Sequence, residues 1–212
     1  MIKLYDYILS GSCYKVRLML SILKVDYELV PVDFYPGLEH KKTEFLALNP
    51  LGQVPVLIYE DLVLRDAQSI LLYLASKFDD SNSWFPDDPA TRGQVAMWTA
   101  FGGGEIMAAS AARLHDVLNY PFDIDQQRKS AHAAFVILDD HIAEQELKGY
   151  DWLAGAAPTI ADIACFPYVS LSEDGGISRE EYPAIERWLR RFMDVPGFID
   201  MPGVLQHWRS DN

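Results

Sequence analysis

Two serines and a cysteine lie close together near the start of the chain, in the segment LSGSCYK at residues 9–15. Ser10 and Cys13 have the spacing of a Cys-x-x-Cys redox pair whose first sulfur has become an oxygen. A serine at this point can cap a helix, and its hydroxyl can also donate a hydrogen bond to an anion. The segment therefore has three interpretations: a redox site that has lost one sulfur, an ordinary helix cap, or a site that uses a hydroxyl.

The residues around this segment predict two strands joined by a helix. Ile2–Tyr7 and Tyr27–Val32 are rich in β-forming residues, which is typical of strands. Between them, apolar residues at helical spacing predict a helix that ends near Lys24. A helix between two strands implies a parallel βαβ unit.

The chain from there to residue 78 completes one sheet. We predict a short helix at Lys42–Leu48, an antiparallel hairpin of Val56–Tyr59 with Leu62–Leu64, and a helix capped by Asp66. The resulting order, βαβαββα, describes a four-stranded mixed sheet with helices on both faces. We therefore predict an α/β domain at residues 1–78.

Composition changes after residue 78. The stretch DDSNSWFPDDPATR at residues 79–92 is polar and contains prolines, as is typical of a linker, which we place at 79–90. Beyond it the apolar residues recur only at helical spacing, so residues 91–212 are predicted to form an all-α domain. Thr159 and Asp162 have the spacing of a capping box, and we assign Asp162 a structural role.

Bulk properties limit the kinds of partner. The 212-residue chain carries a net charge of −13, which disfavours binding to nucleic acid and to anionic membranes. Two cysteines without a signal-peptide pattern are typical of a protein in the reducing cytoplasm. The five histidines and two cysteines have no metal-ligand spacing, so no metal is expected.

Four motifs taken together resemble the cytosolic glutathione transferase family over essentially the whole chain. They are the Ser10-x-x-Cys13 turn, NPLGQVPVL at 49–57, RDAQSILLYLA at 65–75 and APTIADIA at 157–164. The bacterial serine-type, theta-like classes are the most similar. The resemblance implies a thioredoxin-like N-terminal domain, an all-α C-terminal domain, glutathione as co-substrate, a small electrophile as second substrate, and a homodimer.

In this family the site keeps the thiol of glutathione ionised. A free thiol has a pKa near 8.5, and lowering it by about 2 units requires ~2.7 kcal/mol of differential stabilisation. A helix N-terminus and a hydroxyl donor can supply this. Ser10 matches the family's catalytic serine, Ser12 is the first alternative, and Cys13 is the second.

The resemblance also assigns the residues that bind the rest of glutathione. The Val54–Pro55 bond is expected to be cis, with the Val54 backbone paired to the cysteinyl group and Gln53 near the glycine end. His40 matches a position that contacts the glycine carboxylate, although a solvated loop histidine is an equal alternative. Asp66 would pair with the γ-glutamyl ammonium group.

Ala67 departs from the family pattern, because a serine hydroxyl usually binds the γ-glutamyl carboxylate at this position. Losing a hydrogen bond to a charged group costs about 1.5–3 kcal/mol, or roughly 10- to 150-fold in affinity. Backbone N–H groups of the following helix can still bind the carboxylate. We therefore expect weakened glutathione binding.

The electrophile site is expected along a long helix at Met97–His115. Glycines 102–104 inside this helix predict either close helix packing or room for a substrate. Arg113 can hold an anionic substrate or pair with Asp116 or Glu105. The predicted lining residues are Trp98, Phe101, Glu105, Ile106 and Arg113.

Three functions remain open from the sequence. The first is a transferase that conjugates or reduces small electrophiles through a hydroxyl-stabilised thiolate. The second is a non-catalytic, transferase-like binding or regulatory protein, which Ala67 favours. The third is a glutathione-dependent thiol or peroxide reductase that uses Cys13.

Overall fold

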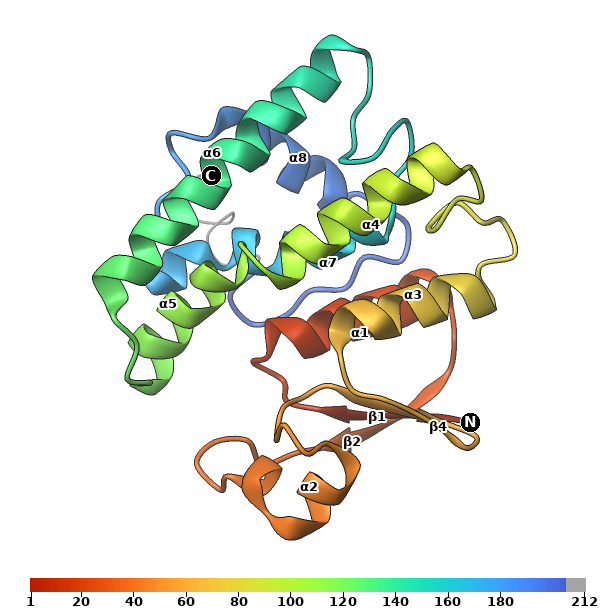
Figure 1. Cartoon of the computed structure of the whole chain (residues 1–212), viewed down its shortest axis with the longest axis vertical. Helices are drawn as coiled ribbons and strands as arrows, with labels where there is room; N and C mark the ends of the chain where they lie inside the picture. Colours follow the sequence, from red (N-terminus) through yellow and green to blue (C-terminus); the bar gives the residue numbers. More distant parts are fainter. Residues whose placement is uncertain (205–212) are drawn as a thin grey trace.

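A computed structural model describes residues 1–204, and its first half contains one four-stranded sheet (Figure 1). Strand β1 (Ile2–Asp6) pairs in parallel with β2 (Tyr27–Pro31) and antiparallel with β3 (Val56–Tyr59). Strand β3 in turn pairs antiparallel with β4 (Leu62–Leu64), which gives the order β2-β1-β3-β4. The predicted mixed sheet is confirmed.

Helices cover both faces of this sheet (Figure 1). Helices α1 (Gly11–Ile22) and α3 (Ala67–Phe78) lie on the face toward the helical half of the chain. The short 3-10 helix η1 (Glu39–Lys41) and helix α2 (Thr43–Leu48) lie on the other side. Because α1 packs against the sheet, α3 and the helical half at once, most of its residues are buried.

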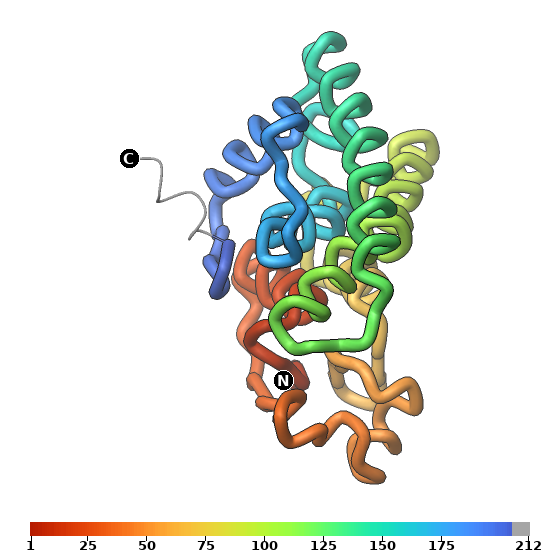
Figure 2. The backbone as a smooth tube through the Cα atoms, turned by 90° about the vertical axis from the view of Figure 1, so that its left-hand side faces the viewer, coloured from red at the N-terminus to blue at the C-terminus, as the bar shows by residue number. Residues whose placement is uncertain are grey.

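Every regular element described beyond residue 78 is a helix, as predicted. Figure 2 shows these helices stacked above the sheet-containing half. They are α4 (Pro89–Gly103), α5 (Met107–Leu118), α6 (Ile124–Leu147), α7 (Ile160–Ser170), the 3-10 helix η2 (Ser172–Gly175) and α8 (Pro183–Met193). Within residues 1–204, no helix has the length and apolarity that crossing a bilayer requires.

Helix α7 lies at the centre of the core. Its predicted capping box is present: Thr159 Oγ1 accepts from Ala161 N, and Asp162 accepts from Thr159 N at 2.9 Å. Asp162 is fully buried and also accepts from Trp188 Nε1 at 2.9 Å. This satisfies the carboxylate, in agreement with the structural role predicted for it.

The single long helix predicted at Met97–His115 is wrong, because the chain breaks between α4 and α5. Gly102 packs so closely on α7 that a Cβ there would lie 2.6 Å from Ala164 O. A Cβ on Gly103 would lie 2.4 Å from the Gln68 amide nitrogen of α3. The glycines therefore allow close packing and end α4, which supports the first of their two interpretations.

Candidate functional site

A cavity of about 460 Å³ opens between the sheet and the helical half. One side, here called the sheet-side wall, is formed by residues from the segments 7–12, 34–41, 52–55 and 65–68. The other side, here called the helix-side wall, is formed by the last residue of α4, by residues of α5 and the loop after it, and by one residue of α7. These are Gly103, Met107, Ser110, Arg113, Leu114, Val117, Leu118, Tyr120, Phe122 and Tyr168.

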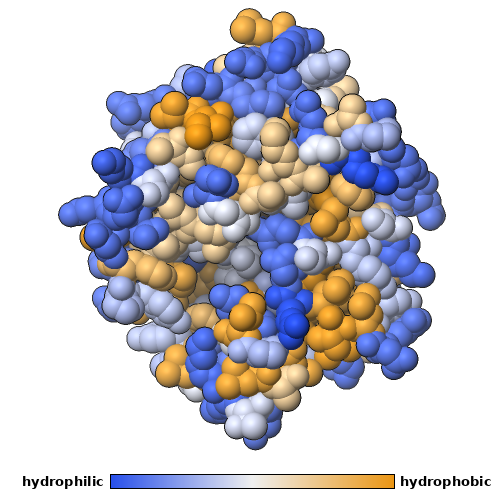
Figure 3. Space-filling view, viewed as in Figure 1, coloured by the Kyte–Doolittle hydropathy of each residue, from blue (hydrophilic) through white to orange (hydrophobic). Residues whose placement is uncertain are grey.

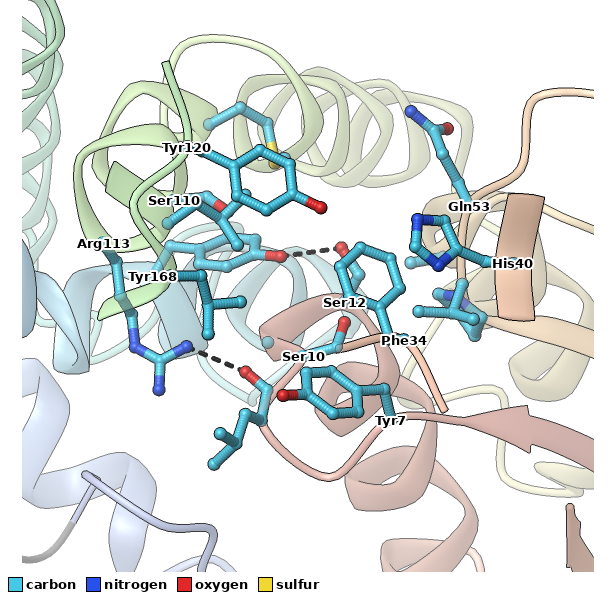
Figure 4. Close-up of a pocket in the computed structure, with 18 of the residues that line it drawn as sticks. Tyr7, Ser10, Ser12, Phe34, His40, Gln53, Ser110, Arg113, Tyr120 and Tyr168 are labelled. Carbon is cyan, nitrogen blue, oxygen red and sulfur yellow. Dashed lines mark hydrogen bonds between the residues drawn. The ribbon is translucent and has the colours of Figure 1, made fainter. Parts of the chain in front are cut away.

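Two serine hydroxyls lie in the cavity at the N-terminus of α1. Ser10 is the N-cap, and its Oγ accepts a hydrogen bond from Cys13 N at 3.2 Å. Ser12 Oγ lies 2.9 Å from Tyr168 Oη of α7 (Figure 4). The first N–H groups of a helix have no intrahelical partner and favour an anion. This end of the cavity is therefore suited to a negatively charged ligand atom.

Cys13 lies behind these serines and does not line the cavity. Its side chain is fully buried, and Sγ accepts from Tyr7 N at 3.5 Å. Burial, with a smaller contribution from the charge of Asp6, raises the pKa of the thiol to about 12. The thiol is therefore protonated at neutral pH and closed to a substrate, so this geometry does not favour Cys13 as a nucleophile.

Arg113 joins the helix-side wall to the loop before Ser10. Its guanidinium donates to Leu9 O and to Asp174, both at 2.8 Å (Figure 4). The ion pair of Arg113 with Asp116 or Glu105 that the sequence suggested is therefore replaced by the pair with Asp174. Asp116 pairs instead with Arg128 at 2.7 Å. Arg113 lines the cavity with its charge already paired, so it orients the backbone of the serine turn.

His40 lies in the sheet-side wall and is only 1% exposed, so the solvated-loop interpretation is wrong. Its ring stacks on Phe34 at 3.8 Å between centroids, and Phe34 stacks on Tyr7 at 5.3 Å. Burial, together with the charge of Lys41, lowers the pKa of His40. Its buried Nδ1 has no hydrogen-bond partner among residues 1–204.

The turn that carries Gln53 and Val54 is held by Asn49. The Asn49 amide donates to Gln53 O at 2.7 Å, and its oxygen accepts from Leu51 N at 3.1 Å. The Val54–Pro55 peptide bond is cis, as expected. Gln53, Val54 and Pro55 all line the cavity, as does Lys41.

The N-terminus of α3 forms another part of the sheet-side wall, through Arg65, Asp66, Ala67 and Gln68. Asp66 caps this helix by accepting from Ser69 N at 2.7 Å. Gln68, in the amide orientation that satisfies both of its groups, donates to Asp66 at 3.1 Å and accepts from Gly103 N at 3.2 Å. Ala67 lines the cavity without a hydroxyl, and Arg65 beside it makes no ion pair within the described chain.

Four of the five residues predicted for the electrophile site do not line the cavity. Trp98, Phe101, Glu105 and Ile106 lie outside it, and only Arg113 is in the lining. Trp98 is buried against Phe101 and His141, and Ile106 is buried in the core. The break after α4 is the physical reason, because the lining on this side comes mainly from α5, and α4 contributes only its last residue, Gly103.

Tyr168 is a lining residue that sequence reasoning missed. It is on α7, two turns beyond the capping box, and its ring lies against Gly11. A Cβ on residue 11 would lie 2.5 Å from Tyr168 Cε1. The glycine between the two serines was therefore the signal for a close neighbour. The described residues contain no cluster of three or more groups that could bind a metal.

Comparison with known proteins identifies the family. Residues 1–76 match the family model of the glutathione S-transferase N-terminal domain, and residues 121–191 match that of the C-terminal domain. Glutathione S-transferase 1 of Dianthus caryophyllus is 32% identical over 191 residues, which cover 87% of this chain and 83% of the relative. The chain therefore belongs to the glutathione S-transferase family.

Other relatives show that members similar to this chain differ in activity. The disulfide-bond oxidoreductase YfcG of Escherichia coli K12 is 28% identical over 209 residues, 94% of each chain. The solved structure of Ure2p in complex with glutathione is 25% identical, with a TM-score of 0.83, and the match covers 92% of this chain and 95% of that one. Family membership thus supports a glutathione-related function. The type of reaction has to be inferred from the geometry of the site.

Proposed function

We propose that this chain is a glutathione transferase. Glutathione binds along the sheet-side wall, and a small hydrophobic electrophile binds against the helix-side wall. The position of Ser10 carries the proposal, because its hydroxyl lies in the cavity at the N-terminus of α1. Since Ser10 Oγ already accepts from Cys13 N, its own hydrogen is available for a thiolate.

The reaction requires the glutathione thiol to be ionised at neutral pH. The N-terminus of α1 carries no acidic residue in its first turn, so its dipole favours the thiolate without opposition. Ser10 then donates to the sulfur and lowers the pKa of the thiol. The thiolate attacks carbon, the carbon–sulfur bond forms, and the leaving group departs with its electron pair.

The remaining contacts match the charges of the tripeptide. The carboxylate of Asp66 lies in the cavity and can pair with the γ-glutamyl ammonium group. Lys41 lies at the other end, with its ammonium group 3.0 Å from Gly52 O, and can pair with the glycine carboxylate. His40 and Gln53 lie on the same wall and can complete the binding site for that carboxylate.

Ala67 leaves the γ-glutamyl carboxylate without the usual hydroxyl, and two groups nearby can compensate. The N–H groups in the first turn of α3 can bind a carboxylate. Arg65, which lines the same end of the cavity, supplies a cation. We therefore propose that glutathione binds with reduced affinity and that Arg65 contributes to holding it.

Restoring the hydroxyl tests this part of the proposal. Ala67→Ser is expected to tighten glutathione binding about three- to tenfold. This is less than the roughly 10- to 150-fold of a full hydrogen bond to a charged group, because the N–H groups of α3 and Arg65 already bind the carboxylate. Isothermal calorimetry on both proteins measures the change. Equal affinities would show that Ala67 costs nothing in binding. Ser69→Ala on the exposed side of α3 is the matched control.

Titrating the parent protein with glutathione and assaying a model aryl halide tests the proposal as a whole. Saturable binding with product formation supports the transferase. Binding without turnover supports the second candidate, a non-catalytic binding protein, which Ala67 favours. No binding at millimolar glutathione would exclude the transferase and the reductase alike. Turnover that survives Ser10→Ala and disappears in Cys13→Ser would favour the reductase.

A homodimer is the remaining part of the proposal. Exposed apolar side chains are present on the sheet half, at Leu51, Leu62 and Val63, and on the helical half, at Met97 and Ile137. Figure 3 shows hydrophobic residues gathered at the surface over the sheet half. Sedimentation velocity at micromolar protein is expected to give twice the chain mass of 24.0 kDa. A species with the mass of one chain would contradict it.

A further inference from the structure

Tyr168 brings a phenol hydroxyl from the helical half of the chain to the serine turn. Its side chain is only 5% exposed, and its Oη lies 2.9 Å from Ser12 Oγ (Figure 4). Its ring occupies the space that a side chain at Gly11 would fill. The ring is therefore fixed against the first turn of α1, with its hydroxyl within hydrogen-bonding distance of Ser12 Oγ.

Lys15 holds the other side of the same ring. Its ammonium group lies 4.8 Å from the centroid of the Tyr168 ring and donates to Gly102 O at 3.1 Å. Lys15 is fully buried, so this contact is shielded from water. Burial raises the pKa of Tyr168, while the hydroxyls of Ser110 and Ser12 oppose the rise. The phenol therefore keeps its proton at neutral pH and can act as a donor.

The two serines of the turn have a common arrangement. Each serine hydroxyl carries one hydrogen and can accept from a second group. Ser10 Oγ accepts from Cys13 N, which leaves its hydrogen free. Ser12 Oγ is placed the same way if the Tyr168 hydroxyl donates to it. Hydrogen bonds arranged in such a chain polarise and strengthen one another.

We propose that Tyr168 is a positioning residue for the sulfur site: it donates to Ser12 and so makes Ser12 a second hydroxyl donor to the glutathione thiolate, beside Ser10. This inference rests on the proposed function, because it concerns the same thiolate. It adds a residue of the helical half to the machinery that ionises the thiol. It also gives a role to Gly11, which leaves room for the ring.

Tyr168→Phe tests the inference, because it removes the hydroxyl and keeps the ring against Gly11 and Lys15. The pKa of glutathione bound to the protein is measured from the ultraviolet absorbance of the thiolate against pH. We expect this pKa to rise by about 0.5–1 unit, which is a three- to tenfold loss of thiolate at a pH below both values. An unchanged pKa would overturn the inference.

Binding of S-methylglutathione separates positioning from a merely structural role, because this ligand has no ionisable thiol. Its affinity, measured by calorimetry, is expected to be the same in Tyr168→Phe and the parent. A loss of affinity equal to the loss of thiolate would show that the substitution only disturbs the cavity. Tyr182→Phe is the matched control. This tyrosine is also 5% exposed and bonds to His132 at 2.8 Å, outside the cavity.

A double-mutant cycle with Ser12→Ala tests the route through Ser12. Ser12→Ala alone is expected to raise the pKa of the bound thiol, and it serves as the independent variant should Tyr168→Phe fail to fold. In the Ser12→Ala protein, Tyr168→Phe is expected to add no further rise. An equal rise in both backgrounds would contradict a route through Ser12. Absence of thiolate in the parent would overturn the proposed function itself, whereas a parent thiolate unaffected by either substitution would overturn only this inference.

Discussion

The two walls of the cavity are built in different ways. On the sheet-side wall, local hydrogen bonds position three of the functional residues: Ser10 and Asp66 cap their helices, and Asn49 closes the turn before Gln53. On the helix-side wall, the cap at Asn119 ends α5 by bonding to the backbone oxygens of Leu114 and His115, but it does not decide which side chains of α5 face the cavity. Their positions follow from where α4 ends and α5 begins. One wall thus depends on local sequence, and the other on packing between helices.

This difference separates chemistry from selectivity. Groups held by caps and turns have fixed positions that distant contacts, such as those of Arg113 and Tyr168, support rather than create, so the sheet-side wall suits a fixed co-substrate. The helix-side wall consists largely of apolar and aromatic side chains, which bind by apolar burial rather than by fixed hydrogen bonds. Substitutions on the two walls are therefore expected to change different kinetic constants.

The largest expected effect is on the sheet-side wall. Ser10→Ala removes a hydrogen bond to the thiolate and is expected to lower kcat/KM about 10- to 150-fold. It also removes the cap of α1, which costs about 1 kcal/mol of stability, so unfolding is measured alongside steady-state kinetics. Ser21→Ala on the same helix is the control, because Ser21 bonds to Gly197 O outside the cavity. Unchanged turnover in Ser10→Ala would contradict the account.

The next largest effect is expected near the end of α4, where Gly102 packs against α7. Gly102→Ala sets a methyl group against the backbone of Ala164 and is expected to destabilise the protein by about 1–3 kcal/mol in denaturant unfolding. Gly93→Ala is the control in the same helix, because its Cβ would meet nothing within 4 Å. It is expected to stabilise by about 0.5–1 kcal/mol. Equal effects of the two substitutions would show that close packing does not end α4.

Lys15 connects both walls, and its contribution depends on pH. Burial lowers its pKa from 10.5 to about 8. The folded protein therefore loses this proton at lower pH than the unfolded chain does, and stability rises with pH between about 8 and 10.5. From pH 7.5 to 9, the free energy of unfolding of the parent is expected to rise by about 1 kcal/mol relative to that of Lys15→Met, which has no ionisable group at this position. A constant difference between the two proteins across this range would contradict it.

The smallest effect is expected on the helix-side wall itself. Leu114→Ala removes a partly buried apolar side chain, and we expect the KM for an apolar electrophile to rise about fivefold, in line with roughly 1 kcal/mol of lost burial. The affinity for glutathione is expected to stay the same. Phe101→Leu is the control, since Phe101 lies outside the lining. A larger rise of the electrophile KM in Phe101→Leu than in Leu114→Ala would contradict this placement and favour the electrophile site expected from the sequence.

The sequence predicted the sheet and its helices because those features depend on short patterns, and the resemblance to the family supplied part of the sheet-side wall, including Ser10, Gln53 and Val54. The runs of β-forming residues, the Asp66 cap and the Thr159–Asp162 capping box are all readable within a few residues. Glycines 102–104 were a visible signal, but where the helix ends depends on Ala164 and Gln68, which lie far along the chain in α7 and α3. Long-range packing of this kind has no local pattern.

The same limit explains Cys13 and Tyr168. Cys13 begins a helix, which on its own lowers the pKa of a thiol. Its complete burial, which raises that pKa, follows from tertiary packing. Tyr168 reaches the serines across 156 positions of sequence. Residues placed by contacts of this range become apparent only in the folded chain.

The central claim is that the serine turn at the N-terminus of α1 holds glutathione as a thiolate. The most direct measurement is the pKa of the thiol of glutathione bound to the parent protein, from thiolate absorbance against pH. We predict a midpoint about 2 units below the value near 8.5 of a free thiol. A bound thiol that titrates at its free value would contradict the account.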